Sequence, residues 1–378
     1  MIYLDNNATT KPFPEVVEAM TQFMTSRFWN VSSAYGQLDG LEEIVESAKA
    51  AIRTLIGAEP NDEVIFTSGA TESNVWAVAE GARRCTSCRW ILSSQIEHPS
   101  INESLENLQK QGVEVRWVPV TRNGTFDLNK LADLVDYNLC FASLMFAHNE
   151  TGVIQPLREA AILIRERAPQ CLIHTDATQA IGKMPVSLLD ELSMVDLISF
   201  SGHKFHGPKG IGGLIIRNGK TLQPLICGGG QQQNLRSGTI NIPAIAGISA
   251  AATKCGKLLQ ENRHISIQLI RDKFEEHIRL HFPDVFILGK QAPRLPNTSF
   301  WGIPGIDADD FVYTSATHGI VIGKGSACSA QSLKPSHTAM LMGYSYDEAS
   351  SLVRVSSSFD TSLNELIDFS DKIHESYP

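Results

Sequence analysis

The stretch Leu197-Ile198-Ser199-Phe200-Ser201-Gly202-His203-Lys204 determines how the rest of the sequence is interpreted. Its apolar half is too short for a typical helix and precedes a glycine-containing polar cluster, which predicts a buried β-strand followed by a turn. In open α/β sheets, ligands bind at the carboxyl ends of the strands. Lys204 is therefore expected at the edge of a sheet, where a binding site would form.

The same arrangement of an apolar run and a polar cluster recurs on both sides of this stretch. Amphipathic segments separate the runs, which is the α/β pattern, and near-continuous apolar runs are typical of a parallel sheet buried on both faces. The sequence thus predicts an α/β protein whose large domain holds a mostly parallel, seven-stranded sheet. The predicted strands cover residues 64–66, 90–92, 113–118, 139–145, 172–174, 197–200 and 212–216.

The pattern changes after about residue 255. Residues 258–282 are expected to form one long amphipathic helix, and several short strands and helices follow, which is typical of a smaller α+β domain. Pro12 and Pro14 interrupt the chain after the N-terminal dozen residues, which we expect beside that small domain. We predict a large domain at 14–255 and a small domain at 1–13 and 256–378.

The composition restricts the classes of function. The 378-residue chain has a formal net charge of -9, and phosphate-binding surfaces need clustered Lys and Arg, so no direct nucleic-acid binding is expected. No stretch approaches the ~20 apolar residues of a membrane span, and residues 1–5 show no secretory signal. Scattered, unpaired cysteines without such a signal are typical of reduced thiols. We therefore expect a cytoplasmic protein that does not associate with membranes.

Lys204 and Asp176 form a pair that suggests a cofactor, since Asp176 also follows an apolar run. A lysine at a strand end commonly points to solvent, and an aspartate there commonly caps a helix, so each residue alone has an ordinary explanation. A lysine that forms a Schiff base, together with an aspartate at a ring nitrogen, is the mark of pyridoxal phosphate. The pair therefore favours pyridoxal 5'-phosphate over the two ordinary explanations.

Residues 68–71 (Ser-Gly-Ala-Thr) supply what a phosphate group needs, because they open a predicted helix and carry hydroxyl donors. The alternative is a generic turn between a strand and a helix. Residues 207–213 are also rich in glycine, but they lack the Walker spacing and precede a strand, so we interpret them as a turn.

Cys328 and Arg354 are further candidates. Cys328 lies in a small, polar, glycine-bearing segment, which predicts an exposed, mobile loop in which nearby lysines lower the thiol pKa. Arg354 lies in an alternating strand and would bind a carboxylate if it points inward; otherwise it is a surface arginine on an edge strand. Cys85 and Cys88 form a lone C-x-x-C, which we interpret as coincidence, and no metal site is expected.

These residues resemble the cysteine desulfurases of the NifS/IscS type, which belong to the class V aminotransferase branch of fold-type I pyridoxal-phosphate enzymes. The resemblance extends from residue 3 to about residue 375, with the motifs in family order. They are residues 4–10 (LDNNATT), 67–74 (TSGATESN), 97–98 (EH), 149–155 (NETGVIQ), 176–179 (DATQ), 201–204 (SGHK), 207–212 (GPKGIG), 236–239 (RSGT) and 325–328 (GSAC).

The resemblance implies a reaction and its catalytic residues. L-cysteine would lose its sulfur to Cys328, which becomes a persulfide, and L-alanine would be released. Lys204 would hold the cofactor and move protons, and His98 would stack on the cofactor ring as an acid–base candidate. A homodimer and a sulfur-acceptor protein are the implied partners, and the mobile loop would carry the persulfide to that acceptor.

The resemblance also implies the binding residues. Asp176 would pair with the pyridine nitrogen and Gln179 with the ring hydroxyl. The phosphate would be held by Ala70, Thr71, Ser201 and His203, with Thr239 reaching it from the second subunit. The substrate carboxylate would be bound by Asn149, Arg354 and Asn30.

The sequence departs from the family pattern in three places. Residues 232–234 are Gln-Gln-Asn where Glu-Arg-Gly is usual, His148 replaces an Asn, and Pro99 replaces a Lys. These changes suggest a specialised desulfurase, and one candidate group resembles the DndA/SspA-type enzymes of DNA phosphorothioate modification, for which the acceptor would belong to a DNA-modification complex.

Other functions remain open at this point. The chain could be a selenocysteine lyase, an aminotransferase of the same fold, or a non-catalytic subunit of a sulfur-transfer complex. Cys328 favours the desulfurase over a transaminase, which needs no thiol. The presence of Lys204, Asp176, His98 and Arg354 argues against a non-catalytic subunit.

Overall fold

A computed structural model describes residues 1–85, 89–325 and 335–377 and contains the predicted seven-stranded sheet. The strands follow the spatial order β2-β8-β7-β6-β5-β3-β4. Only β8 runs antiparallel to its neighbours, so the sheet is mostly parallel, as predicted. Its members are β2 (Glu63–Thr67), β3 (Trp90–Ser94), β4 (Glu114–Val118), β5 (Leu139–Ser143), β6 (Leu172–Asp176), β7 (Leu197–Ser201) and β8 (Gly212–Ile216).

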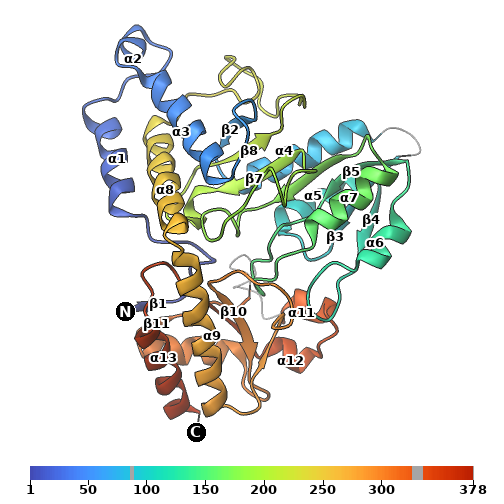
Figure 1. The fold of residues 1–378 in the computed structure, drawn as a ribbon, viewed down its shortest axis with the longest axis vertical. Helices are drawn as coiled ribbons and strands as arrows, with labels where there is room; N and C mark the ends of the chain where they lie inside the picture. Colours follow the sequence, from blue (N-terminus) through green and yellow to red (C-terminus); the bar gives the residue numbers. More distant parts are fainter. Residues whose placement is uncertain (86–88, 326–334, 378) are drawn as a thin grey trace.

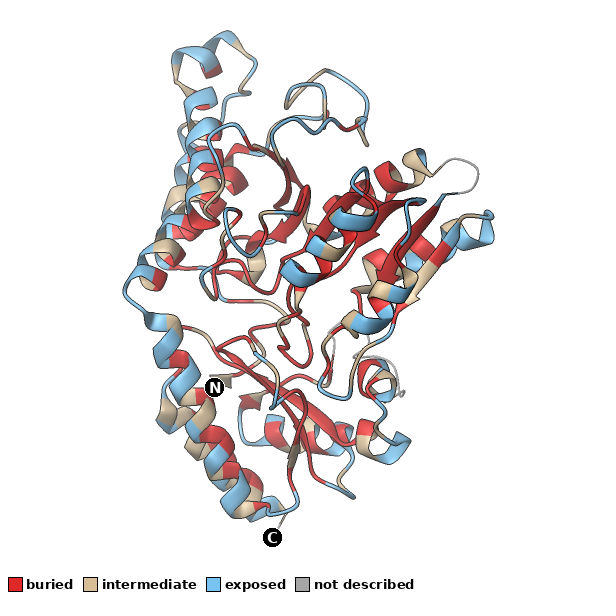
Figure 2. Ribbon diagram, turned by 45° about the vertical axis from the view of Figure 1, so that its right-hand side comes forward, coloured by how far each residue is buried: buried red, intermediate tan, exposed pale blue. Residues whose placement is uncertain are grey.

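The sheet is buried because its strands are apolar on both faces. In β2, Val64 and Phe66 belong to one core cluster while Ile65 belongs to another, which is the two-residue alternation of a strand covered on both sides. Figure 2 shows the strands as a buried layer between helices with exposed outer faces. The helices of this domain are α1 (Pro14–Thr25), α2 (Ala34–Leu38), α3 (Leu41–Leu55), α4 (Ala70–Arg84), α5 (Pro99–Lys110), α6 (Leu128–Leu134), α7 (Leu157–Arg167) and α8 (Ile242–Gln260).

The C-terminal part of the chain forms a second layered unit around a short antiparallel sheet in the order β12-β10-β9. In β10, Trp301 faces one core cluster and Phe300 another, so this sheet also carries helices on both faces. Its strands are β9 (Phe286–Ile287), β10 (Thr298–Gly302) and β12 (Leu352–Ser356). Its helices are α9 (Arg263–His281), α10 (Ala308–Thr317), α11 (His337–Leu341), α12 (Tyr346–Ser350) and α13 (Leu363–Ser376).

The expected single helix at 258–282 is wrong, because two helices meet there. α8 continues to Gln260, and α9 begins at Arg263. Between them Asn262 has φ 57, a left-handed conformation that asparagine tolerates better than most residues and that ends the first helix. The division into 14–255 and two flanking segments remains a prediction, and its boundary at 255 falls inside α8.

The N-terminal segment, residues 2–10, lies between the two units (Figure 1). β1 (Ile2–Tyr3) pairs in parallel with β11 (Ile320–Val321), and Thr10 N donates to the carbonyl of His203 at 2.9 Å. The first residues of the chain therefore pair with a strand of the C-terminal unit and also reach the end of β7. In the part of the chain that the structure describes, no helix has the length and apolarity needed to span a membrane.

Candidate active site

Lys204 follows the carboxyl end of β7 and lies in the 3₁₀ turn Gly202–Lys204. Its Nζ donates to the backbone carbonyls of Asn7 and Ala8 at 2.7 and 2.8 Å. The N-terminal segment thus provides two oxygen acceptors for the ammonium group. Lys204 is half-buried and lines a cavity. The two backbone carbonyls hold its amine in position there.

Asp176 ends β6, the strand next to β7. Its carboxylate is buried and accepts from Asn74 Nδ2 at 2.7 Å and from the backbone N–H of Thr178 at 2.9 Å. These two donors stabilise a buried negative charge and fix the orientation of the carboxyl group.

A cavity of about 470 Å³ lies between the carboxyl edge of the large sheet and the C-terminal unit, a volume in the range of small-molecule and cofactor sites. It brings together residues that are far apart in the sequence. Of the predicted site residues, the cavity is lined by Ala70, Thr71, His98, Asn149, Asp176, Gln179, Ser201, His203, Lys204 and Arg354.

His98 precedes α5 and caps its first turn. Its Nδ1 accepts from the backbone N–H of Ser100 at 3.1 Å, so a neutral ring carries its proton on Nε2. Burial lowers the pKa of His98, and the nearby Lys204 lowers it further, against the opposing effect of Asp176. The imidazole is therefore neutral at neutral pH, with a donor nitrogen at Nε2.

The part of the cavity lined by Ala70 and Thr71 is suited to an anion. α4 is a 15-residue helix that begins at Ala70. Its first residues, including Thr71, therefore line the cavity together with Ser201 at the end of β7. Glu72 does not line the cavity, and its carboxylate accepts from Ser68 N at 2.8 Å and forms an ion pair with Arg236 at 2.9 Å. Burial lowers the pKa of His203 to about 4, with Lys204 and Lys209 contributing, so this histidine is a neutral hydrogen-bonding group.

Gln179 belongs to a buried network with Asn7 and Lys183. Its Oε1 accepts from Lys183 Nζ at 2.5 Å, and its Nε2 donates to the carbonyl of Asn7 at 3.1 Å. Lys183 also donates to Asn7 Oδ1 at 2.8 Å. The network holds the Gln179 amide in one orientation at the cavity wall.

Arg354 points inward, so the interpretation as a surface arginine is wrong. Its side chain is only 1% exposed. Nη2 contacts Asp5 Oδ1 at 2.6 Å and Nη1 donates to the carbonyl of Asn149 at 3.0 Å. Arg354 therefore meets an anion from the N-terminal segment, and this ion pair holds the guanidinium at the cavity.

Two of the predicted residues do not line this cavity, and a third lies outside the described residues. Thr239 and Asn30 are exposed and do not line it. Cys328 lies outside the described residues, as does Cys88 of the C-x-x-C pair; the adjoining Gly325 and Ser336 are described. Ser336 Oγ donates to Glu150 Oε2 at 2.7 Å, one residue from Asn149. One flank of the segment that carries Cys328 is therefore attached close to a cavity-lining residue.

Each of the three departures from the family pattern includes one residue whose identity the structure explains. His148 Nδ1 accepts from the backbone N–H groups of Glu150 and Thr151 at 3.2 Å, as an asparagine side chain does in an Asx turn. Asn234 stands where the family usually has glycine and has φ 64, a conformation that asparagine adopts more readily than other non-glycine residues. Pro99 occupies the first turn of α5, where its fixed φ suits a helix start.

The residues of the cavity fit pyridoxal phosphate. Thr178 Oγ1 and Arg354 Nε are buried polar atoms of lining residues, and neither has a hydrogen-bond partner within the described residues. Buried polar atoms are rarely left unpaired, so such atoms indicate a polar ligand. An amine, a buried carboxylate and a helix N-terminus around one cavity provide the donors and acceptors that this cofactor needs.

Sequence reasoning missed several residues of the site. Asn74 donates a hydrogen bond to Asp176, and Lys183 donates one to Gln179. Asn7 accepts hydrogen bonds from Lys183, Gln179 and Lys204. The available signals were the motifs at 4–10 and 67–74 and a lysine four positions after Gln179. For Asn74 and Asn7 these signals do not indicate the hydrogen-bond partners, because those partners lie more than 100 residues away, whereas Lys183 lies only four residues from Gln179.

Comparison with known proteins adds independent findings. The family model described as aminotransferase class V matches residues 2–369. A cysteine desulfurase of Cereibacter sphaeroides is 37% identical over 366 residues, which is 97% of this chain and 92% of the relative. A solved structure titled NifS-like protein matches with a TM-score of 0.90 at 33% identity, covering 100% of this chain and 99% of that chain. The crystal structure of DndA from Streptomyces lividans matches with a TM-score of 0.77 at 31% identity, covering 92% of this chain and 97% of that chain.

Proposed function

This chain belongs to the class V aminotransferase family, on its cysteine desulfurase branch, and from that membership we propose that Lys204 and Cys328 carry out its chemistry. L-cysteine and the Cys328 thiol yield L-alanine and a Cys328 persulfide. The carbon–sulfur bond of the substrate breaks, a sulfur–sulfur bond forms on Cys328, and the thiol proton is retained by the products. The equation balances without an external oxidant or reductant.

A single observation supports this proposal most strongly: Asp176 ends β6, Lys204 lies in the turn that follows the adjacent strand β7, and both line the same cavity as His98. A lone lysine at a strand end is ordinary. A lysine held by two carbonyls and a carboxylate held by two N–H donors, facing one cavity, form a preorganised site.

The same residues would bind pyridoxal 5'-phosphate. When bound, the cofactor supplies an electron sink for charge that develops on the substrate. Asp176 would hold the pyridine nitrogen and Gln179 the ring hydroxyl. The phosphate would be held by Ala70, Thr71, Ser201 and His203, a set that combines helix N–H groups, hydroxyls and a neutral imidazole.

The acid–base roles follow from the resting protonation states. Because the neutral His98 ring carries its hydrogen on Nε2, it would donate a hydrogen bond there to the bound cofactor or substrate, and it would act as an acid only after taking up a second proton. Lys204 would hold the cofactor and then move a proton as the base. Two groups with separate proton-transfer roles would thus face the same substrate.

The substrate carboxylate would bind to Arg354 and Asn149, with Asn30 completing the set. The guanidinium is a planar donor fork suited to a carboxylate, and its unpaired Nε leaves one donor for such a group.

We also propose a homodimer, in which Asn30 and Thr239 reach the cavity of the second subunit. Both residues are exposed and lie outside the cavity of their own chain. Phe28 and Tyr35, which flank Asn30, are 63% and 68% exposed. Aromatic residues are enriched in interfaces between subunits, so a dimer would cover these rings.

For the sulfur acceptor we propose a protein that takes the persulfide sulfur directly from Cys328. The match to DndA does not by itself favour DNA modification, because the NifS-like structure matches with a higher TM-score over more of the chain. An acceptor in a DNA-modification complex therefore remains a prediction.

Two variants test the proposed chemistry. We expect Cys328→Ala to retain the yellow colour of lysine-bound pyridoxal phosphate and to release no sulfide from cysteine in the presence of a thiol reductant. Lys204→Ala should lose both the colour and turnover. Full sulfide release by Cys328→Ala would reject the role of this thiol and would favour a selenocysteine lyase or another enzyme of the fold. An unaltered Lys204→Ala enzyme would reject the cofactor assignment.

A further inference from the structure

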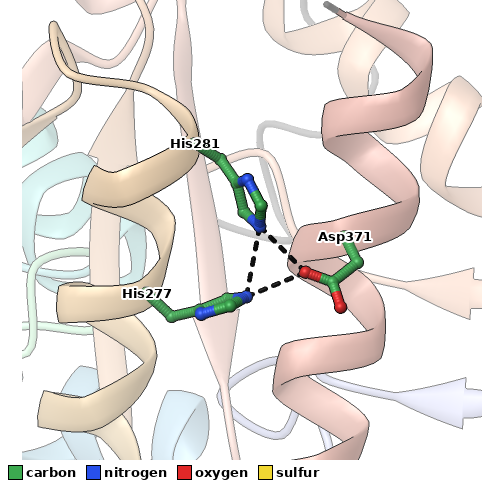
Figure 3. Close-up of side chains that lie close together, drawn as sticks. All are labelled: His277, His281 and Asp371. Carbon is green, nitrogen blue, oxygen red and sulfur yellow. Dashed lines mark hydrogen bonds and ion pairs between the residues drawn. The ribbon is translucent and has the colours of Figure 1, made fainter.

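A second group of side chains with metal-binding chemistry lies outside the cavity. His277 and His281 of α9 and Asp371 of α13 converge on one point, as Figure 3 shows. Among the described residues this is the group whose His, Cys, Asp or Glu ligand atoms all lie within 4.8 Å of one another. None of the three residues lines the cavity that holds Lys204 and Asp176, so the proposed desulfurase chemistry does not explain the cluster.

The position of these side chains follows from two packed helices. His277 and His281 are four residues apart in α9, so they lie on the same face, one turn from each other. α13 runs parallel to this face, because Phe274 stacks on Phe369 and, further along both helices, His281 stacks on His374 with ring centroids 4.4 Å apart. The helices therefore hold the ligand atoms without help from a loop.

The three atoms form a closed triangle. His277 Nε2 and His281 Nε2 each lie 2.8 Å from Asp371 Oδ1, and the two nitrogens lie 3.2 Å apart. Each Nε2 carries at most one hydrogen and the ionised carboxylate carries none. Two hydrogens can satisfy only two of the three contacts, so the third contact has no hydrogen between its two atoms. A cation inside the group would satisfy all three atoms at once.

The triangle has the dimensions of a coordination sphere. Metal–nitrogen and metal–oxygen bonds of about 2.0–2.2 Å place neighbouring ligand atoms about 2.9 Å apart at right angles and about 3.3 Å apart in a tetrahedron. The observed separations of 2.8, 2.8 and 3.2 Å are close to this range. An ion could sit over the triangle with only small movements of the side chains.

The ligand types indicate which ion would bind. Two imidazole nitrogens and one carboxylate suit zinc and similar first-row transition metals, whereas magnesium and calcium prefer all-oxygen sites. The side chains of His277, His281 and Asp371 are 26%, 23% and 50% exposed. Solvent can therefore reach the group, which provides an entry path and leaves positions for water ligands.

We propose that His277, His281 and Asp371 form a site for a zinc-class divalent transition metal on the outer surface of the C-terminal unit. The ion ties α13 to α9. Its role is structural, because it joins two helices of the unit whose β12 carries Arg354 and it does not contact the cavity.

Equilibrium dialysis of the holoenzyme against zinc chloride, after chelator treatment and desalting, tests this site. Zinc per subunit is measured for the wild type, His281→Ala, Asp371→Asn and the control His318→Ala, which removes another exposed histidine of the same unit. Thiols and the cofactor can also bind zinc, but they are the same in all four proteins. The difference between proteins therefore reports the site.

We expect the wild type and His318→Ala to bind one more zinc per subunit than the other two variants. In His281→Ala and Asp371→Asn the affinity at this site should fall by at least about tenfold, since even outer-shell substitutions cost that much. Zinc should raise the unfolding temperature of the wild type and not that of Asp371→Asn. Equal zinc content in all four proteins, or an equal thermal shift in the wild type and Asp371→Asn, would overturn the proposal.

Discussion

Lys183 Nζ lies 2.5 Å from Gln179 Oε1, and this contact determines which end of the amide carries the donor for the cavity. Gln179 Oε1 accepts from Lys183 Nζ, so the amide oxygen faces the lysine. Gln179 Nε2 then donates one hydrogen to the carbonyl of Asn7 and has a second hydrogen for a ligand. Burial lowers the pKa of Lys183 well below its usual value, and Lys204 and Arg354 lower it further.

Lys183→Met should alter the bound cofactor without removing any residue that would contact it. Where the Lys183 amine is protonated, the variant removes a positive charge that acts on Lys204, so the pH at which the visible band of the cofactor titrates should rise, by about one unit. Gln179 Oε1 and Asn7 Oδ1 would each lose a hydrogen bond at a cost of about 1–3 kcal/mol. Spectrophotometric pH titration measures the first effect, with the exposed Lys257→Met as control. A titration identical to that of the wild type would show that Lys183 is only structural.

Asp5→Asn should reveal the cost of the buried guanidinium. Arg354 would lose its anionic partner while remaining buried, so we expect the free energy of unfolding to fall by about 3 kcal/mol. The product L-alanine supplies a carboxylate, so it should raise the unfolding temperature more in Asp5→Asn than in the wild type.

The matched control for Asp5→Asn is Asp309→Asn. It breaks an equally short ion pair with Lys324, but the Asp309 side chain is 50% exposed, so the cost should be below about 1 kcal/mol. Equal losses in the two variants would contradict the role that we assign to burial.

Glu97→Gln should show a stability difference that depends on pH. Burial raises the pKa of Glu97 well above its ordinary value, and Asp176 raises it further. Above about pH 4.3 the unfolded chain releases this proton while the folded chain keeps it, so wild-type stability is reduced as pH rises. Glutamine keeps the Oε1 that accepts from Met145 N at 2.5 Å and has no proton to lose. In urea unfolding, the free energy of unfolding of Glu97→Gln relative to that of the wild type should be higher at pH 8 than at pH 5. A difference that is constant with pH would mean that Glu97 is ionised in the folded protein.

Acidic pH should destabilise the wild type through its buried histidines. Burial lowers the pKa of His174 to about 4, so below about pH 6.5 the unfolded chain binds a proton that the folded chain does not. Stability is lost as pH falls from about 6.5 towards 4, by an amount on the order of 2–3 kcal/mol for this group. Glu97 acts in the opposite direction over part of this range, but the pKa is also lowered at His98, His148, His203, His206 and His264. Urea unfolding at pH 7 and pH 5 measures the combined effect of these groups on the free energy of unfolding. Equal stability at the two pH values would contradict the predicted loss at acidic pH.

Substitutions at Asn234 should follow its backbone conformation. With φ 64, glycine is accommodated easily, and a β-branched residue is strained by about 1–2 kcal/mol. Asn234→Gly should therefore match or exceed wild-type stability, and Asn234→Val should be less stable. The reverse order in thermal unfolding would show that the asparagine side chain, and not its backbone angle, is what matters at this position.

Much of the fold was predictable because the central strands are short apolar runs with clear ends. The run ending at Lys204 and the run ending at Asp176 fall at the ends of adjacent parallel strands, as their shared pattern indicated. The helix break at Asn262 was not predicted, since hydrophobic periodicity continues across a single left-handed residue.

The residues that line the site were largely predictable, because many of them follow the ends of strands. The contacts between them were less predictable. Ten of the predicted residues line one cavity. The partner of Arg354 could not be predicted, because Asp5 reaches it through a tertiary arrangement that local pattern does not encode, whereas the contact between Gln179 and Lys183 is local in sequence. The cluster of His277, His281 and Asp371 was missed for the same reason, since its third member is 90 residues from the second.

The pairing of β1 with β11 has a consequence for biosynthesis. Ile2 and Tyr3 leave the ribosome early, but their strand partners, Ile320 and Val321, are made only after most of the chain. The carbonyls of Asn7 and Ala8 that hold Lys204 belong to this early segment. A nascent chain stalled before residue 320 could form the seven-stranded sheet, yet it would lack the strand that anchors this segment, so competence for catalysis should arrive late in translation.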